Sequence, residues 1–182
     1  MRFCSLFAPV VFLISSCFSL GRGSTLAETL PTDEGRLRLY HTHTGQHIDL
    51  TFRRGTEYIP EALSRLDYFL RDYRTGDIHH FDPRLFDVLT TLMKDSGHED
   101  GELHIVCGYR SPATNEYLRT HTSGVAKTSL HMQAEAIDIR LPGFQTAKLR
   151  DIALSLGKGG VGYYPVSNFI HVDVGQIGRA HV

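Results

Sequence analysis

Two histidines and one aspartate are the residues of this sequence best suited to chemistry. His131 and Asp138 lie seven positions apart in the stretch SLHMQAEAIDIR, and His171 follows in FIHVDV. Two imidazoles and one carboxylate suit zinc, and three protein ligands leave a fourth position for water, which is typical of catalytic zinc sites. Zinc lowers the pKa of water to near neutrality and so makes hydroxide available for attack on an amide carbonyl.

The same three residues also have ordinary structural explanations. In a chain with 11 histidines, some pairs of histidine and aspartate arise by chance. His131 would then lie in a solvated loop, Asp138 would be hydrogen-bonded at a strand edge, and His171 would have its partners within the sheet. The spacing alone does not decide between these explanations and a metal site.

Two predicted strands must position these residues. Along residues 136–141, Asp138 lies on the face opposite to the apolar side chains, and along residues 169–174, His171 does the same. If the two strands pair in one sheet with their polar faces aligned, Asp138 and His171 can meet. His131, in the loop that enters the first strand, can then fold over them.

The remaining pattern predicts one α+β domain with a mainly antiparallel sheet and flanking helices. Residues 37–52 are expected to form a β-hairpin with its turn at Thr44 and Gly45. Apolar residues at steps of three and four, together with Asp-Pro and Ser-Pro starts, predict helices. These helices are expected over residues 61–74, 82–97, from 111 onward and around 149–156, with a further strand at 103–107.

Length and composition fit a single globular domain. The chain has 182 residues, of which 41% are hydrophobic and 21% are charged. A formal net charge of -1 and the lack of a basic stripe give no reason to expect nucleic-acid binding. No repeat or long linker is visible, and we expect a monomer.

The first residues predict export. Arg2 precedes an apolar run, and the small residues at 25–27 suit cleavage, so residues 1–27 are predicted to be a signal peptide. A retained membrane anchor and a lipoprotein lipidated at Cys17 are alternatives. Cleavage would leave Cys107 as the only cysteine, so no intramolecular disulfide could form. We expect this thiol, in an apolar strand, to be buried and structural rather than nucleophilic.

We expect the last six residues of the sequence to differ in origin from the predicted domain. Residues 177–182, IGRAHV, match the translation of a common sequencing-adapter oligonucleotide. We therefore expect this tail to be non-native and leave His181 out of the site. The predicted domain spans residues 37–176.

Several motifs resemble one known family. The pairs Ser129 and His131, Ala136 and Asp138, and His171 and Asp173 occur together with GYRS at 108–111 and GGVGYYP at 159–165. Together they resemble the YcbK-like murein endopeptidases (endopeptidase K) over roughly residues 37–175. That family belongs to the clan of VanX-like and D-Ala-D-Ala carboxypeptidases, which has the Hedgehog/DD-peptidase fold. The clan's zinc ligands follow the order His, Asp, His, which implies that His131, Asp138 and His171 bind Zn²⁺.

The resemblance also implies an activity. It points to an exported enzyme of the bacterial periplasm or cell envelope that hydrolyses peptide cross-links of peptidoglycan (murein). In the best-known members the bond is the direct one between two diaminopimelate residues. Arg110 matches an arginine that relatives use near the scissile carbonyl, where a guanidinium could stabilise the oxyanion; the alternative is an arginine that holds a carboxylate or a helix end. A non-catalytic peptidoglycan-binding module and a D,D-carboxypeptidase acting on stem peptides stay open.

Three departures from the clan pattern bear on the mechanism. Asn168 stands where many members have an acidic general base, and an amide cannot accept a proton from water at neutral pH. Asp173 is the substitute candidate, with orientation of a ligand imidazole as its other role. Ala134 stands where glycine is common, at a cost of about 1 kcal/mol if the backbone needs a positive φ. Because the twin-arginine pair is missing, we expect the general secretory route.

Other conspicuous residues have less specific predictions. His41 and His43 alternate along the first predicted strand and are expected to be solvated surface histidines. Tyr163 and Tyr164 precede Pro165 and either line a cleft or take part in ordinary packing.

Overall fold

The computed structural model describes residues 1, 33–122 and 124–175 of the chain. The described residues from Asp33 onward form one compact unit, which contains every described helix and strand. The predicted signal peptide, Cys17 and the predicted non-native tail lie outside the described residues, apart from Met1. Within the described ranges, no helix has the length and apolar character needed to cross a membrane.

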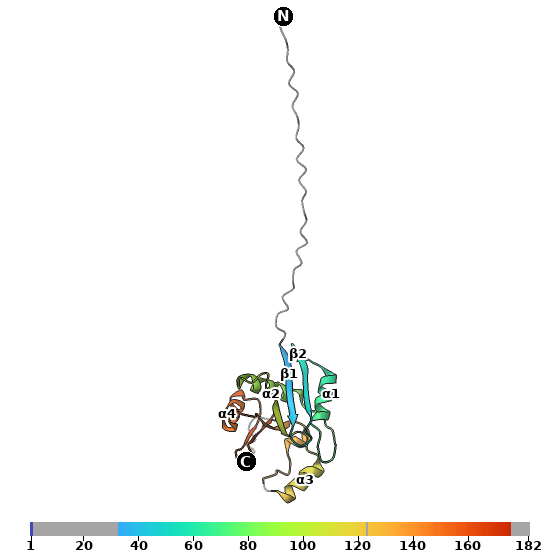
Figure 1. Cartoon of the computed structure of the whole chain (residues 1–182). Coiled ribbons are helices and arrows are strands. Elements are labelled where there is room, and N and C mark those ends of the chain that lie inside the picture. The colour runs from blue at the N-terminus through green and yellow to red at the C-terminus, as the bar shows by residue number, and fades with distance from the viewer. Residues whose placement is uncertain (2–32, 123, 176–182) are drawn as a thin grey trace. The chain divides into compact units, whose positions relative to one another are not determined.

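Among the described residues, seven strands form one sheet in the order β3-β2-β1-β4-β5-β7-β6 (Figure 1). Of the pairings between these strands, β1 with β4 is parallel and the others are antiparallel. The predicted α+β class with a mainly antiparallel sheet is thus confirmed. The strands are β1 Glu34–His41, β2 His47–Arg54, β3 Glu57–Tyr58, β4 Leu103–Cys107, β5 Ala136–Arg140, β6 Val161–Tyr164 and β7 Phe169–Asp173.

Helices flank this sheet. Helix α1 packs against β2, and α2 packs against β1 and α4 (Figure 1). Three of the helices begin at proline, which has no N–H to leave unpaired in the first turn. The helices are α1 Pro60–Phe69, α2 Pro83–Asp95, α3 Pro112–His121 and α4 Thr146–Leu156, with a short 3₁₀ helix, η1, at Leu130–Gln133.

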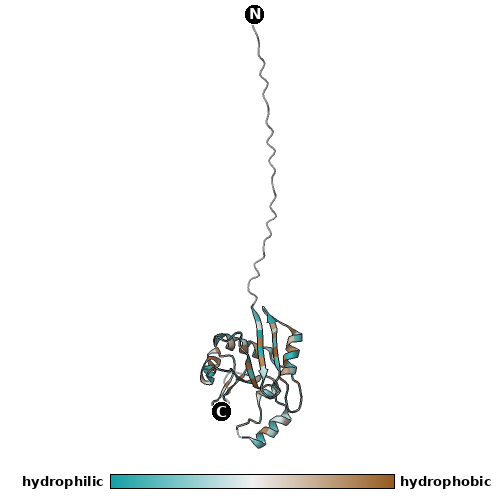
Figure 2. Ribbon diagram, viewed as in Figure 1, coloured by the Kyte–Doolittle hydropathy of each residue, from teal (hydrophilic) through white to brown (hydrophobic). Residues whose placement is uncertain are grey.

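The core is built from alternate residues of the strands. Ile105, Ile139 and Ile170 lie opposite one another on β4, β5 and β7, and all three are fully buried. Figure 2 shows the corresponding alternation of polar and apolar residues along β1 and β2, where every second side chain of β1 is buried. This arrangement leaves the polar residues of β5 and β7 on the opposite face of the sheet.

Helix α1 is shorter than its apolar spacing predicts. The prediction covered residues 61–74, but the helix ends at Phe69. The reason is the side chain of Asp72, which accepts hydrogen bonds from the backbone N–H groups of Arg74 and Ser111, both at 2.9 Å. Such bonds compete with the helical pattern, so the chain turns toward β4 instead.

Ala134, which follows η1, adopts the left-handed conformation with φ of 53°. The condition under which alanine is costly at this position is therefore met, and the cost is about 1 kcal/mol for a residue with a Cβ. The turn brings the chain back toward η1, where the N–H of Glu135 donates to the carbonyl of Leu130 at 3.1 Å just before β5 begins.

Candidate active site

The pairing of β5 with β7 brings the predicted residues together. Asp138 lies directly opposite His171 in this antiparallel register, and η1 places His131 over both. The Nε2 atom of His131 is 3.1 Å from Oδ1 of Asp138 and 3.2 Å from Nδ1 of His171. Nδ1 of His171 is 3.0 Å from the same Asp138 oxygen. All three side chains are buried, so their donor atoms form a compact triangle beneath the surface.

Each imidazole is held from behind by an acceptor. His131 donates from Nδ1 to the carbonyl oxygen of Gly108 at 2.9 Å. The Nε2 atom of His171 is 3.2 Å from Oδ2 of Asp173. Because one nitrogen of each ring carries its proton and donates it to the acceptor behind, the other nitrogen can turn its lone pair toward the shared centre. Histidines that bind metals show this arrangement almost always.

The charges of the cluster favour a cation at its centre. Burial by itself would lower the pKa of His131, but the Asp138 carboxylate beside it raises that pKa to about 10. Burial opposes ionisation of Asp138 as well, yet the neighbouring His131 and His171 hold its pKa well below the ordinary value. The pKa of His171 is also raised, against the effect of burial, by its hydrogen bonds to Asp138 and Asp173.

The donor set and its spacing fit a zinc ion. Ligand atoms about 2.0 to 2.1 Å from a tetrahedral zinc ion are separated from one another by roughly 3.3 Å. The separations of 3.0 to 3.2 Å among the three donor atoms are close to that value. Two nitrogens and one oxygen are also the ligand types of open, catalytic zinc sites.

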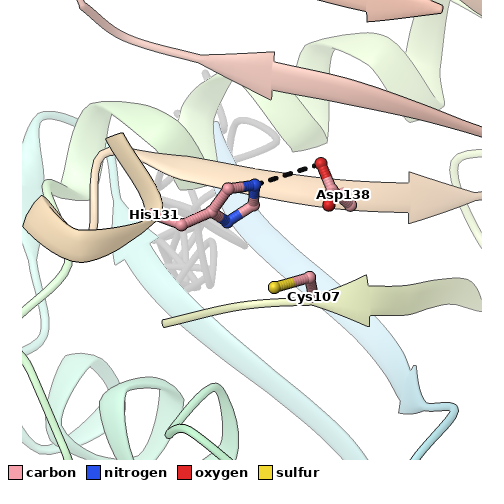
Figure 3. Close-up of side chains that lie close together, drawn as sticks. All are labelled: Cys107, His131 and Asp138. Carbon is pink, nitrogen blue, oxygen red and sulfur yellow. Dashed lines mark hydrogen bonds and ion pairs between the residues drawn. The ribbon is translucent and has the colours of Figure 1, made fainter. Parts of the chain in front are cut away.

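Cys107 lies at the edge of this cluster (Figure 3). Its Sγ is within 4.8 Å of the donor atoms of His131 and Asp138, and the residue is half-buried. The expectation of a buried structural thiol missed this placement. An irregularity in the register of β4 between Ile105 and Cys107 turns the thiol to the face that carries Asp138, which simple alternation does not predict.

Arg110 also reaches the site. Its Nη2 atom is 3.8 Å from Oδ2 of Asp138 and donates to the Cys107 sulfur at 3.5 Å. The backbone N–H of Arg110 donates to the carbonyl of His131 at 3.2 Å, which ties its segment to η1. Within the described residues the buried Nε has no hydrogen-bond partner. The guanidinium is therefore held in place without all of its donors being used.

The segment that carries Arg110 is anchored at both ends. The carboxylate of Asp72 accepts hydrogen bonds from the backbone and hydroxyl of Ser111, at 2.9 and 2.7 Å. At the other end, a Cβ added to Gly108 would lie 2.5 Å from the Leu70 carbonyl oxygen. Only glycine fits at that close approach, which explains the first residue of the GYRS motif.

Asp173 lies behind His171. Its Oδ1 accepts hydrogen bonds from the N–H groups of Gly160 and Gly175 at 2.8 and 3.0 Å, and its side chain is almost fully buried. A Cβ on Gly160 would lie 2.4 Å from Oδ2 of Asp173, which accounts for the glycine pair in the GGVGYYP motif. Of the two roles that the sequence leaves open for Asp173, this position favours orientation of the imidazole.

Asn168 lies outside the cluster of His131, Asp138 and His171 and outside the lining of the adjoining cleft. It lies in the turn between β6 and β7 with φ of 54°, a conformation that asparagine tolerates well. Its side-chain oxygen accepts a hydrogen bond from Thr146, at the start of α4. The residue is held by its turn, and it contributes nothing to the cleft that reaches His131 and His171.

The cluster opens into a cleft of about 410 Å³. One wall comes from the end of α3 and the loop that follows it, and the other from the hairpin of β6 and β7. The described residues that line it include Arg110, Leu118, Val125, Ser129, His131, Asp138, Tyr164, Phe169 and His171. A peptide can therefore reach the donor atoms from solvent.

The expectation for His41 was wrong. It is only 1% exposed, whereas His43 is exposed as expected. The ring of His41 packs edge-on against Phe69 and Tyr73, at centroid distances of 5.8 and 6.2 Å. Alternation along a strand did not reveal that the loop after α1 covers this residue.

Comparison with known proteins decides the family. Residues 30–180 match the model of the family described as peptidoglycan L,D-endopeptidase MepK. The chain belongs to the MepK family. The MepK of Escherichia coli strain K12, a peptidoglycan L,D-endopeptidase, is 44% identical over 148 residues, covering 81% of each chain. A probable MepK of Haemophilus influenzae is 41% identical over 141 residues, covering 78% of this chain and 76% of the relative.

Membership of the MepK family makes this chain a peptidase and confirms the resemblance drawn from its motifs. The matched residues include the whole of the cluster and cleft described above.

Proposed function

We propose that this chain is a zinc-dependent endopeptidase of the cell envelope that hydrolyses peptide cross-links of peptidoglycan. His131, Asp138 and His171 are its zinc ligands. The observation that carries the proposal is the triangle of their donor atoms, 3.0 to 3.2 Å on each side, at the floor of a cleft in a chain of the MepK family.

When bound, a zinc ion supplies Lewis acidity and lowers the pKa of water toward neutrality. The residues of the chain bind and position the peptide and stabilise the charge that develops on its carbonyl. Arg110 lines the cleft beside Asp138, where the terminal N–H groups of its guanidinium can donate to a peptide carbonyl that gains negative charge. The walls of the cleft, from the loop after α3 and the hairpin of β6 and β7, can keep the peptide beside the donor atoms.

Asp173 acts on His171 in this proposal. Its Oδ2 holds the proton of His171 on Nε2, so that Nδ1 presents its lone pair to the shared centre. The N–H groups of Gly160 and Gly175 fix the carboxylate in turn. Asp173 is thus a positioning residue, and its buried place behind the imidazole leaves it out of reach of a substrate in the cleft.

The bond between two diaminopimelate residues is the proposed target. The relatives are named L,D-endopeptidases, and a direct bond between two diaminopimelates joins an L centre to a D centre. Such a bond lies in the middle of a cross-link, so its hydrolysis requires that peptide chain extends from the site on both sides.

The test combines metal analysis with product masses. Zinc content is measured on the purified mature chain, which is then incubated with cross-linked muropeptides. We expect about one zinc per chain and conversion of cross-linked dimers to monomers. Release of a single terminal amino acid would identify a carboxypeptidase, and a zinc-loaded folded chain that binds sacculi without turnover would identify a binding module. Either result would overturn the proposal.

A further inference from the structure

A row of paired residues crosses the sheet at the position of the proposed zinc ligands. Asp138 on β5 lies opposite His171 on β7, which lies opposite Gly162 on β6. The third position in this row has no side chain. The ring of Tyr164 occupies the space instead: a Cβ added to Gly162 would lie 3.0 Å from Cε2 of Tyr164 and 3.5 Å from its hydroxyl oxygen. The phenol therefore lies beside His171, folded back along its own strand.

Tyr164 is held firmly while its hydroxyl stays available. Its ring stacks on Phe169 with a centroid distance of 4.5 Å and an interplanar angle of 16°. Both residues line the cleft that contains His131 and Asp138. Among the described residues the Tyr164 hydroxyl has no hydrogen-bond partner. Tyr164 is 42% exposed and lines the cleft, so a substrate can reach it. A fixed donor without a protein partner at the rim of a reaction site is suited to bind substrate.

The strand order sets Tyr164 and Arg110 on the two flanks of the cluster. Arg110 follows β4 and Tyr164 lies on β6, with the ligand-bearing β5 and β7 between them. Both side chains are donors toward a carbonyl, since a guanidinium never loses its proton in proteins and a phenol keeps its own until about pH 10. Burial raises the pKa of Tyr164 further, with a smaller contribution from Asp138, while Arg110 opposes the rise.

We infer that Tyr164 is a further catalytic residue, whose hydroxyl donates a hydrogen bond to the carbonyl oxygen of the peptide bond being hydrolysed, from the flank opposite Arg110. The inference rests on the proposed function. Its physical basis is that a fixed donor is worth most where negative charge develops during the reaction. A Cβ at position 162 would lie 3.0 Å from both the Tyr164 ring and the Cβ of His171, so a side chain there would crowd the phenol and the imidazole.

Tyr164→Phe removes the hydroxyl and keeps the ring on Phe169. The matched control is Tyr163→Phe, because Tyr163 has a similar exposed fraction, 38%, and points to the other face, where the guanidinium of Arg150 lies 4.6 Å from its ring centroid. For Tyr164→Phe we expect kcat on cross-linked muropeptides to fall on the order of 10²-fold, as when one oxyanion donor is lost. KM, zinc content and melting temperature should match those of the parent and of Tyr163→Phe.

A kcat for Tyr164→Phe within about twofold of the parent value, or a loss confined to KM, would overturn the inference.

A second measurement needs no turnover. A phosphinate pseudopeptide carries tetrahedral anionic oxygens that imitate the developing charge, and its affinity for the zinc-loaded chains is measured by calorimetry. We expect Tyr164→Phe to bind it about tenfold more weakly than the parent and Tyr163→Phe do. Equal affinities of the parent and Tyr164→Phe would refute the role of the hydroxyl. A parent chain that cuts no muropeptide refutes the proposed function alone, since the affinity comparison still decides about Tyr164.

Discussion

Two buried histidines of this chain, His41 at the end of β1 and His131 above β5, have opposite electrostatic characters. They are 1% and 2% exposed. Burial, with smaller contributions from His43 and Arg71, lowers the pKa of His41 to about 4, whereas the pKa of His131 is raised to about 10. The same loss of solvent therefore accompanies a neutral ring in one region and, beside the Asp138 carboxylate, a ring that favours its positively charged form in the other.

The difference lies in the partners. His41 is packed among the aromatic rings of Phe69 and Tyr73. His131 has the carboxylate of Asp138 on one nitrogen and the carbonyl of Gly108 on the other. Burial of an imidazole alone favours its neutral form, and only a fixed negative partner reverses this preference. A buried histidine is therefore a candidate metal ligand when polar partners fix both of its ring nitrogens, as they do in His131 and not in the aromatic surroundings of His41.

The largest difference in zinc binding and activity is expected when one histidine is removed from each region. His131→Ala should abolish stoichiometric zinc binding and lower muropeptide hydrolysis by on the order of 10³-fold or more, because most of the rate enhancement depends on the site. His41→Leu should keep one zinc per chain and most of the activity, since His41 serves packing. Metal analysis and initial rates measure both, and zinc retained by His131→Ala would contradict the ligand assignment.

Asp173→Asn tests the orientation of His171. The asparagine carbonyl can still accept from Gly160 and Gly175, but its amide group presents donors to the His171 ring. We expect zinc affinity to fall about 10- to 100-fold, as for other residues that orient metal-binding histidines. Competition with a chelator measures the affinity. Asp49→Asn, in an exposed ion pair with Arg36, is the control and should leave zinc affinity unchanged.

The glycines next to the two histidines allow a finer comparison. Gly108→Ala should cost about 1 to 3 kcal/mol, because its Cβ would meet the Leu70 carbonyl, and should weaken zinc binding by shifting the acceptor of His131. Gly45, whose N–H donates to the His41 carbonyl, has φ of 68° and open space around its Cβ position. Gly45→Ala should cost about 1 kcal/mol with zinc affinity unchanged. Urea unfolding and chelator competition separate the two effects.

The smallest expected effect is a pH dependence due to His41. Its folded pKa of about 4 is below the ordinary value of 6.5, so the unfolded chain binds more protons between these values. The free energy of unfolding should therefore decrease as pH falls from about 6.5 to about 4, and this contribution should vanish above that range. Urea unfolding of the zinc-loaded parent and of His41→Leu across the range measures it. Identical pH profiles would show that His41 does not titrate as a buried neutral ring.

Local sequence patterns predicted much of the fold and the chemical types of the site. Alternation placed Asp138 and His171 on the polar faces of their strands, and the structure pairs them directly. Helix starts at proline were also correct. The end of α1 was not, because a hydrogen bond from Ser111 to Asp72 joins residues far apart in the chain. Strand β6 was missed, since its short glycine-containing run has no strong alternation.

The sequence by itself determined which residues could hold a metal, because the period of a strand and the residue types depend only on local order. Tertiary structure alone decided which nitrogen of each imidazole faces the centre, that Asp173 lies behind His171, and that Tyr164 folds over Gly162. These features depend on differences of a few tenths of an ångström in the distances between strands and loops that are far apart in the sequence. Such distances follow from the packing of the whole domain.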